Sequence, residues 1–258
     1  MSILNIKNIT KNFGGLAAVL DVNIELNPGD LVGLIGPNGA GKTTIFNLLS
    51  GLYTLDEGTV ELDKNGKTLN IANKKAYVIS NLGLTRTFQN IRLFKKLTVL
   101  ENVEIACHRV CDYGFLTAIL RLPKYYRQEA VCHESSLAIL AEVGLEKQAD
   151  IIAENLSYGE QRKLEIARAL ATAPLILFLD EPAAGMNPQE TKELTALIKR
   201  IRDKYQLTIL LIEHDMSVVM NICERIYVLD YGSIIAEGQP EEIKNNKRVI
   251  EAYLGGSD

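Results

Sequence analysis

The sequence is poor in cysteine, has no long apolar run and shows no excess of positive charge. Four cysteines among 258 residues are too few and too scattered to form the disulfide framework of a small secreted protein. No stretch approaches the roughly 20 apolar residues that a membrane-spanning helix needs. The first residues lack the basic start, apolar stretch and cleavage site of a signal peptide, so we expect a cytoplasmic protein. Any role at a membrane would then depend on partner proteins.

The charge balance argues against one class of partner. Lys and Arg total 28 against 32 Asp and Glu, which leaves a net charge of −4. Domains that bind nucleic acid usually carry a strong basic excess, so we expect no nucleic acid among the partners. The composition is otherwise ordinary for a globular protein. The length suits one large α/β domain, or a core domain that carries a sizeable insertion.

Cysteine and histidine gather in a way that invites comparison with a zinc site. The group consists of Cys107, His108, Cys111, Cys132 and His133. However, the Cys-x₃-Cys spacing differs from that of zinc fingers, and both parts lie in sequence with helical periodicity. We therefore expect reduced thiols on helices here, and a metal site is the weaker alternative.

Two strand patterns alternate along the chain. Alternation of apolar and polar residues predicts a small antiparallel β layer, with strands at 3–9, 19–26 and 58–63. Runs that are apolar throughout indicate strands buried on both faces of a parallel sheet, at 31–35, 175–179 and 208–212. We interpret residues 74–90 as a further strand followed by a loop. Two more strands, near 225–230 and 233–237, and a short polar helix end the chain.

Helical periodicity dominates the middle of the chain. Residues 98–150 carry apolar side chains at helical spacing and predict a helical insertion. Further helices are expected at 157–171, where Ser157 and Glu160 have capping-box spacing, and at 188–204. Residues 112–128 combine aromatic and basic side chains. They form either a contact surface or the solvated end of an amphipathic helix, and we favour the second because exposed basic residues are common.

A phosphate-binding loop stands between the first buried strand and the start of a helix. The stretch has the pattern of a glycine, four residues and Gly-Lys-Thr, and comprises Gly36, Pro37, Asn38, Gly39, Ala40, Gly41, Lys42 and Thr43, followed by Thr44. The glycines let backbone N–H groups turn toward phosphate oxygens, and the helix N-terminus adds partial positive charge. We expect Lys42 to neutralise the β- and γ-phosphates and Thr43 to ligate Mg²⁺. The loop therefore predicts a nucleotide site.

Polar side chains also end the other two buried strands. Asp180 and Glu181 follow one, and Glu213 and His214 follow the other. Ligands of open parallel sheets bind beyond the carboxyl ends of the strands. We expect Asp180 to hold Mg²⁺, Glu181 to act as general base toward water, and His214 to contact the γ-phosphate. The alternatives are a simple turn at Asp180 and Glu181, and a loop histidine at His214.

The order of these motifs resembles the ATP-binding subunits of ABC transporters. A phosphate loop, a glutamine-bearing loop at Gln89, the signature Leu156-Ser157-Tyr158-Gly159-Glu160, the Asp180-Glu181 strand and His214 follow one another over essentially the whole chain. Local details are similar to the branched-chain amino acid importer subunits of the LivG type, namely Arg86-Thr87-Phe88-Gln89, Leu164-Glu165-Ile166-Ala167-Arg168, Glu181-Pro182-Ala183-Ala184-Gly185-Met186-Asn187-Pro188 and Ile212-Glu213-His214-Asp215-Met216.

The resemblance implies a fold and a domain plan. It implies an α/β fold with a P-loop NTPase (RecA-like) core built on a parallel sheet, an N-terminal antiparallel β layer and an inserted α-helical subdomain. The whole chain would be one ABC ATP-binding domain. Its parts would be the β layer with the first part of the core (1–97), the helical subdomain (98–157), the second part of the core (158–238) and a C-terminal helical tail (239–258).

The resemblance also implies roles and partners. Two such subunits, identical or homologous, would face each other head to tail, so that Ser157, Tyr158, Gly159 and Glu160 act in trans on ATP bound to the partner. Phe13 would stack on adenine, with a core phenylalanine as the alternative. Gln89 would join Mg²⁺ and the attacking water to two membrane permease subunits, which a solute-binding protein would serve.

Two residues depart from the general family pattern. Tyr158 replaces a glycine, and Asn187 replaces an aspartate whose loss could weaken communication between the two sites. Both features are shared by the LivG type.

We therefore expect a peripheral ATPase on the inner face of the cell membrane that drives uptake of branched-chain amino acids or a similar solute. One alternative is an ATP-dependent switch outside transport, although such proteins usually carry two cassettes or a long coiled coil. Another is a lipopolysaccharide-export ATPase, from which Tyr158 and the loop at 183–187 point away.

Overall fold

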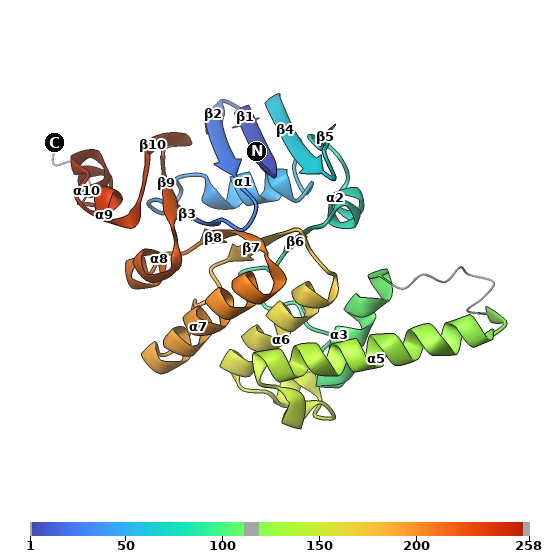
Figure 1. Cartoon of the computed structure of the whole chain (residues 1–258). Coiled ribbons are helices and arrows are strands. Elements are labelled where there is room, and N and C mark those ends of the chain that lie inside the picture. Colours follow the sequence, from blue (N-terminus) through green and yellow to red (C-terminus); the bar gives the residue numbers. More distant parts are fainter. Residues whose placement is uncertain (1, 111–118, 255–258) are drawn as a thin grey trace.

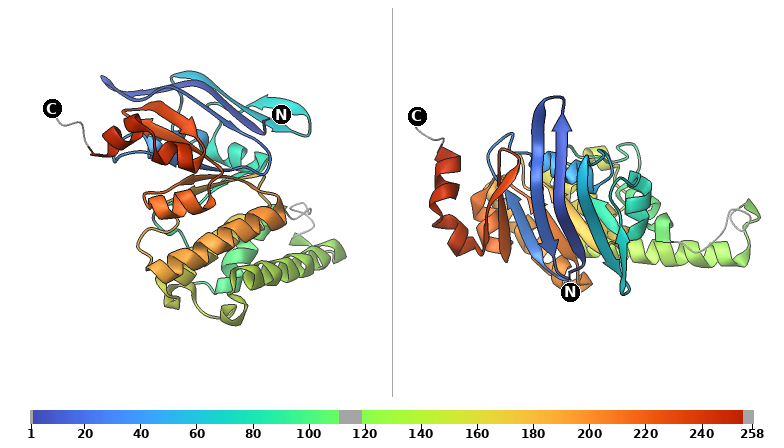
Figure 2. Two further views of the ribbon diagram at one scale, coloured as in Figure 1. Left: turned by 60° about the vertical axis from the view of Figure 1, so that its left-hand side comes forward. Right: turned by 90° about the horizontal axis from the view of Figure 1, so that it is seen from above.

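The computed structural model describes residues 2–110 and 119–254, which form three layers (Figure 1). An antiparallel sheet lies at the top of this view, a mostly parallel sheet crosses the middle, and a group of helices lies below. The left view of Figure 2 shows the same layers from another side, and its right view looks down on the antiparallel sheet. The predicted fold class is confirmed, including the antiparallel β layer that precedes the phosphate-loop strand.

The antiparallel layer has four strands in the order β2-β1-β4-β5. Their bounds are β1 (Leu4–Phe13), β2 (Leu16–Leu26), β4 (Glu57–Lys64) and β5 (Lys67–Asn70). The first three match the predicted strands, but they are longer because each continues into a hairpin or a bulge. β5 was not predicted, since its side chains are exposed and leave no burial pattern in the sequence.

The central sheet has six strands in the order β10-β9-β3-β8-β7-β6. Only β10 pairs in antiparallel fashion. The bounds are β3 (Leu31–Ile35), β6 (Leu84–Arg86), β7 (Ile176–Asp180), β8 (Thr208–Ile212), β9 (Arg225–Asp230) and β10 (Ser233–Gly238). Every residue of β3, β7 and β8 is buried. This burial explains their apolar sequences, because both faces of the sheet are covered.

Successive residues of each buried strand enter two different cores. In β3, Val32 and Leu34 join the core between the two sheets, where α1 also lies. Leu31 and Ile35 join the core beneath the sheet, together with the helices of the lower layer. The alternation arises because successive side chains of a strand point to opposite faces of the sheet. It anchors β3 from both sides and so holds the loop that follows it.

The described helices include four that begin with a capping box. Thr98, Ser157, Asn187 and Gln239 each hold the N-terminus of a helix in this way. The bounds are α1 (Lys42–Leu49), α2 (Ala76–Leu82), α3 (Val99–Cys107), α5 (Pro123–Val143), α6 (Tyr158–Ala171), α7 (Pro188–Tyr205), α8 (Met216–Ile222), α9 (Pro240–Lys244) and α10 (Lys247–Leu254). The predicted cap at Ser157 is confirmed. The bounds of the helical subdomain, 98 and 157, stay a prediction.

The interpretation of residues 74–90 as a strand followed by a loop was wrong in its first half. Residues 76–82 form α2, which ends at Gly83 in the left-handed region, and the strand is only Leu84–Arg86. The sequence Tyr-Val-Ile favours a strand by intrinsic preference. Here Ile79 instead packs one helical face into the core between the sheets. Tertiary packing therefore overrides the local preference.

Among the described residues, the cysteines and histidines near 107–133 lie on α3, on the 3₁₀ turn His108–Val110 and on α5. Cys107 is buried on α3 and Cys132 on α5, while His133 contacts Glu104 at 2.8 Å. Cys111 lies outside the described residues, as does part of the aromatic and basic stretch at 112–128. Within the described ranges no three His, Cys, Asp or Glu side chains are grouped to hold a metal ion. Nor is any helix of those ranges both long enough and apolar enough to cross a bilayer.

Candidate functional site

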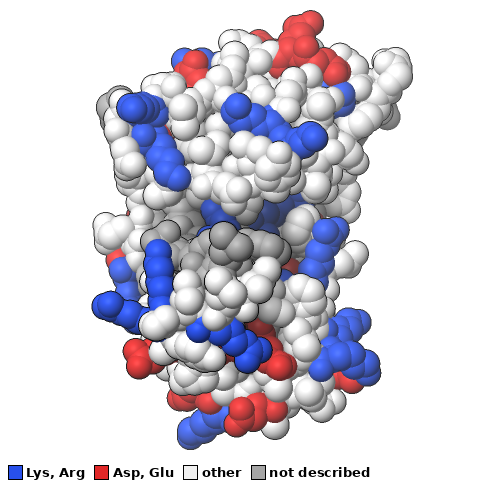
Figure 3. All heavy atoms as spheres, turned by 90° about the vertical axis from the view of Figure 1, so that its right-hand side faces the viewer, with Lys and Arg blue, Asp and Glu red and all other residues white. Residues whose placement is uncertain are grey.

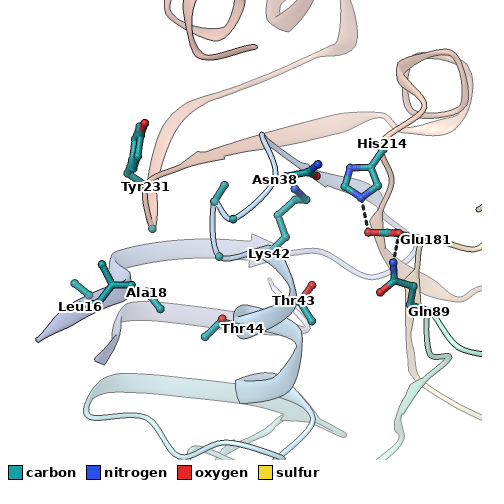
Figure 4. Close-up of a pocket in the computed structure, with 15 residues that line it drawn as sticks. Leu16, Ala18, Asn38, Lys42, Thr43, Thr44, Gln89, Glu181, His214 and Tyr231 are labelled. Carbon is teal, nitrogen blue, oxygen red and sulfur yellow. Dashed lines mark hydrogen bonds and ion pairs between the residues drawn. The ribbon is translucent and has the colours of Figure 1, made fainter. Parts of the chain in front are cut away.

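Three neighbouring strands end beside one another at the candidate site. β8 lies between β3 and β7 in the sheet, and Leu34, Ile212 and Asp180 are aligned across the three strands. The residues that follow each strand therefore emerge at one edge. Figure 4 shows the phosphate loop, Glu181 and His214 gathered there. The sequence prediction that these motifs meet is confirmed.

The phosphate loop depends on glycine at two close backbone contacts. Gly36 has a φ of 149°, and a Cβ placed there would lie 1.9 Å from the carbonyl oxygen of Leu229. Gly41 has a φ of 107°, and its Cβ would lie 2.4 Å from the carbonyl oxygen of Ala18. Any larger residue would push the loop away from β9 or β2. The loop then passes directly into α1, so that its last N–H groups point to the site as helix N-termini do.

Lys42 lies folded back within this loop. Its Nζ donates to the carbonyl oxygens of Gly36 at 2.6 Å and of Pro37 at 2.8 Å. Burial lowers the pKa of Lys42, and the nearby charge of Glu181 acts in the opposite direction. The ammonium group is thus held over the loop and lies in the cavity lining with Thr43 and Thr44. It is placed to meet an anion without a large rearrangement.

Glu181 is the centre of the polar cluster opposite the loop. Gln89 Nε2 donates to Glu181 Oε2 at 2.7 Å, and His214 Nε2 contacts Oε1 (Figure 4). The residue is buried and has a φ of 48°, in the left-handed region that is uncommon for a side chain of this size. Strain of this kind is typical of functional sites. A carboxylate held from both sides in this way is oriented to accept a proton from water.

Glu213 does not line the cavity as His214 does, and instead connects two loops. Its carboxylate accepts from the backbone N–H of Ala183 at 2.8 Å and from that of His214 at 3.1 Å. Burial raises the pKa of Glu213, and these hydrogen bonds oppose the shift. The side chain therefore ties the loop after β7 to the loop after β8. This bridge sets the distance between Glu181 and His214.

The residues enclose a cavity of about 580 Å³. That volume lies within the usual range for small-molecule sites. In Figure 4, Leu16, Ala18 and Tyr231 lie at one end and Glu181 with its partners at the other. The lining consists of Leu16, Ala17, Ala18, Asn38, Gly39, Ala40, Gly41, Lys42, Thr43, Thr44, Gln89, Glu181, His214, Tyr231 and Gly232.

Sequence reasoning missed the part of this lining that comes from β2 and the β9–β10 turn. Gly232 N donates to the carbonyl oxygen of Ala40 at 2.9 Å, and Leu20 N donates to that of Gly232 at 2.8 Å. The turn therefore braces the phosphate loop from the side. The only local signal was the Tyr231-Gly232 pair between two strands, which predicts a turn and gives no hint of its neighbours.

Several predicted residues do not line the cavity. Phe13 is exposed at the end of β1 and packs edge-on against Tyr53, with ring centroids 5.3 Å apart. Asp180 is buried behind Glu181, where its Oδ2 accepts from Arg86 Nη2 at 2.6 Å. The signature, Ser157 to Glu160, begins α6 away from the cavity lining. The roles given to these residues stay predictions.

The signature is built as the cap of α6. Ser157 N donates to Glu160 Oε2 at 2.9 Å, and Glu160 N donates to Ser157 Oγ at 3.3 Å. Tyr158 is half exposed, and its hydroxyl accepts from Arg162 Nη2 at 2.9 Å. This arrangement presents the N-terminus of a 14-residue helix at the surface rather than to the cavity of the same chain.

Comparisons with known families agree with this geometry. The sequence model of the ABC transporter family matches residues 19–184. That of the branched-chain amino acid ATP-binding cassette transporters matches residues 233–258. The first match contains the phosphate loop, Gln89, the signature and Glu181.

Two curated relatives resemble this chain over nearly its whole length. The high-affinity branched-chain amino acid transport ATP-binding protein LivG of Escherichia coli is 47% identical over 253 residues, which cover 98% of each chain. The lipopolysaccharide export system ATP-binding protein LptB of Haemophilus influenzae is 34% identical, over 99% of this chain and 98% of that protein.

Solved structures show the same fold. MJ1267, an ATP-binding cassette of an ABC transporter in its ADP conformation, has a TM-score of 0.83 and 33% identity over 99% of both chains. The cassette MJ0796, solved as a dimer in a post-hydrolysis state with ADP and Pi, has a TM-score of 0.74 and 26% identity over 92% of this chain.

Proposed function

The chain belongs to the ABC transporter family of ATP-binding proteins, and on that premise we propose that it powers an importer of branched-chain amino acids. The family assignment makes it an ATPase. The observation that carries the catalytic part of the proposal is the position of Glu181. It faces the phosphate loop across one cavity, and Gln89 and His214 hold its two oxygens.

The cavity suggests how ATP would lie. The β- and γ-phosphates would rest on the loop from Gly36 to Thr43, with Thr44 beside them, at the N-terminus of α1. Lys42 would exchange the carbonyl oxygens of Gly36 and Pro37 for phosphate oxygens. The base would extend toward Leu16 and Ala18, near Phe13 at the turn of the β1–β2 hairpin.

The residues near the γ-phosphate position fit a magnesium ion. The Thr43 hydroxyl and the Gln89 amide are in the cavity lining, and Asp180 lies directly behind Glu181. Hydroxyl, amide and carboxylate oxygens are the hard ligands that Mg²⁺ binds. A magnesium ion held by these residues would supply positive charge to offset the negative charge that develops on the phosphates. Arg86 occupies one oxygen of Asp180, which leaves the other for a contact directly or through water.

Glu181 and His214 divide the remaining chemistry. Glu181 would take the proton of the attacking water, while His214 would hydrogen-bond the γ-phosphate. Gln89 orients the carboxylate in the present structure through its Nε2. Because Gln89 orients the general base, a movement of Gln89 would change the orientation of the Glu181 carboxylate and with it the rate of hydrolysis.

We propose that the complete site needs a second ATPase subunit, identical or homologous. Ser157, Tyr158, Gly159 and Glu160 lie off the cavity of their own chain. They would close over ATP on the partner, where the α6 N-terminus would meet the γ-phosphate. The dimeric MJ0796 structure, which carries ADP and Pi, supports this arrangement by similarity.

The face beside Gln89 is the proposed contact with two membrane permease subunits. Two adjoining hollows, of about 180 and 250 Å³, share Thr85, Arg86 and Phe88. Arg92 and Arg168 line the second hollow. Figure 3 shows Lys and Arg side chains distributed over this side of the molecule, including its middle. The subunit would sit peripherally on the inner face of the cell membrane, and a solute-binding protein would deliver the solute to the permeases.

The solute is inferred from similarity, since the ATPase itself would not touch it. Identity to the E. coli branched-chain amino acid protein exceeds identity to the lipopolysaccharide export protein, 47% against 34%. The C-terminal match to branched-chain amino acid cassettes points the same way. Stimulation of the reconstituted complex by leucine with its binding protein would support import. Stimulation by lipopolysaccharide, or isolation only with ribosomes or DNA, would reject it.

The base assignment is tested by replacing Glu181. Glu181→Gln should bind ATP with nearly normal affinity but hydrolyse it about 100-fold more slowly or worse, since general-base catalysis contributes factors of this size. Phosphate release and equilibrium binding of a fluorescent ATP analogue would measure the two effects. Glu61→Gln, on the outer β layer, is the matched control and should behave as the parent. Hydrolysis at the parental rate by Glu181→Gln would show that another residue is the base.

A further inference from the structure

Arg162 is a buried side chain that joins α6 to the segment carrying Gln89. It is 2% exposed. Its Nη1 donates to the carbonyl oxygen of Phe88 at 2.8 Å, and its Nη2 contacts the carbonyl oxygen of Gln89. The planar guanidinium serves the two carbonyls through two different nitrogens, a fixed geometry that the single nitrogen of a lysine does not reproduce. The backbone at Gln89 is therefore held by a residue of the signature helix.

Tyr158 is attached to the same guanidinium. Arg162 Nη2 also donates to the Tyr158 hydroxyl at 2.9 Å, one helical turn earlier on α6. The tyrosine ring lies beside Gly185, where an added Cβ would be 3.4 Å from the ring carbon Cε1. Gly185 belongs to the loop that follows Glu181. The tyrosine that replaces the usual signature glycine thus lies against the loop that follows Glu181, and Arg162 links it to the segment that carries Gln89.

Glu165 fixes the orientation of Arg162. The two form a buried ion pair at 3.1 Å, and Glu165 Oε1 accepts from the backbone N–H of Phe88 at 3.3 Å. Arg162 Nε is buried without a hydrogen-bond partner. An unpartnered buried donor is unfavourable, and apolar residues often replace buried ion pairs without loss of stability. This cost argues that the arginine serves a purpose other than packing.

The contacts form one continuous path through the molecule. It begins at the Tyr158 hydroxyl on the half-exposed start of α6 and passes through Arg162 to the backbone of Gln89. From there the Gln89 amide reaches Glu181 at 2.7 Å, and Glu181 contacts His214. One end is at the surface and the other is the proposed general base.

We propose that Tyr158 and Arg162 are positioning residues that make the general base of one subunit respond to ATP bound by the other. This inference rests on the proposed function, in which Tyr158 meets the nucleotide of the partner subunit. Closure of the dimer would then shift Tyr158, and Arg162 would carry that shift to Gln89 and Glu181. Each site would reach full activity only when the opposite site holds ATP.

The experiment compares ATP hydrolysis by the parent chain, Tyr158→Phe and Arg162→Lys, with Tyr205→Phe as control. Tyr158→Phe keeps the ring against Gly185 and removes only the hydroxyl, so its folding is not at risk. Tyr205 is a partly exposed tyrosine at the end of α7, outside the path. Rates are measured across ATP concentrations, and dimer formation with a non-hydrolysable ATP analogue is followed by light scattering.

The parent and Tyr205→Phe should show a cooperative dependence on ATP. Tyr158→Phe and Arg162→Lys should still dimerise with the analogue and keep the ATP concentration for half-maximal rate within about twofold. Their kcat should fall about tenfold, within the usual range of coupling between sites, and their Hill coefficient should fall toward one. A purely structural role would lower thermal stability and leave the cooperativity of the folded fraction unchanged.

Two results would overturn the inference, and they are distinguishable. If Tyr158→Phe keeps both the parental kcat and the parental cooperativity, the link is wrong while the proposed function stands. If the parent chain neither dimerises with the analogue nor hydrolyses ATP, both alone and mixed with a homologous ATPase subunit, the proposed function fails and the link fails with it.

Discussion

Arg86 and Asp180 show how one buried pair can serve both stability and the site. Their side chains are 6% and 3% exposed and meet at 2.6 Å. Arg86 also donates to Asn47 on α1 at 2.7 Å and stacks between the rings of Phe46 and Phe88. It therefore extends from the hollow proposed for the permeases to the carboxylate proposed for Mg²⁺. Removing either charge leaves the other buried and unpaired.

Arg86→Met should lower the free energy of unfolding by about 3 kcal/mol, because Asp180 then keeps a buried charge without its partner. Adding Asp180→Asn should recover part of that loss, so the double variant is more stable than the sum of the single changes predicts. Urea unfolding of Arg86→Met, of Asp180→Asn and of the double variant would measure the three free energies. Lys7→Met is the control, since its pair with Glu61 is exposed and should change stability by less than about 1 kcal/mol. Strict additivity would contradict the coupling.

At the scale of elements, the loop between β7 and α7 ends in a helix cap. Asn187 Oδ1 accepts from the backbone N–H groups of Gln189 and Glu190, both at 3.0 Å. Glu190 Oε2 in turn accepts from Asn187 N at 3.0 Å. The asparagine that departs from the family pattern thus starts an 18-residue helix as well as an aspartate would. Its local role is structural, whatever its effect between subunits.

Asn187→Ala should destabilise the fold by about 1 kcal/mol, the usual loss for an N-cap side chain. Asn187→Asp should match or exceed the parent, because it keeps the acceptor and adds a negative charge at the helix N-terminus. Thermal unfolding of the two variants side by side would test this. An alanine variant as stable as the parent would show that the cap contributes little here.

On the proposed function, the whole molecule presents two halves of different sites. Its phosphate loop and Glu181 face one cavity, while its signature begins α6 elsewhere on the surface. α6 nevertheless packs against α3 and α5 beneath the central sheet. A movement of the signature would therefore carry the helical layer with it, and the hollow at Arg86 and Phe88 lies where that layer meets the sheet.

Specific ATPase activity should rise with the concentration of the chain if, as proposed, each complete site takes its signature from a second copy of the chain. Over a hundredfold dilution series at saturating ATP, the rate per chain should fall steeply once the dimer dissociates. ATP binding should persist in the dilute samples, since the phosphate loop lies within one chain. A rate per chain that is constant across the series would mean that a single chain forms the whole catalytic site.

The sequence by itself determined the parts of this protein that depend on short segments. Residues 36–43 specify the phosphate loop because a turn of that shape requires glycines at fixed positions. The strand before Asp180 and Glu181 follows from a short run that is apolar throughout. The cap at Ser157 follows from the position of Glu160 three residues later. The meeting of Gly36, Glu181 and His214 at one edge followed from the rule for parallel strands. The order of the motifs along the chain also indicated the family.

Only the tertiary structure decided which distant segments touch. Nothing local to Tyr231 indicates that it lines the cavity. The segment of α2 was predicted as a strand because the burial of Ile79 in the core between the sheets is not visible in the local sequence. The sequence also does not reveal that Arg86 pairs with Asp180, 94 positions away. Nor does it reveal that Arg162 contacts the carbonyl oxygen of Gln89, 73 positions away. A buried arginine is a poor sequence signal, since arginine is usually exposed. Its partners, and with them the path from Tyr158 to Glu181, depend on how the layers pack.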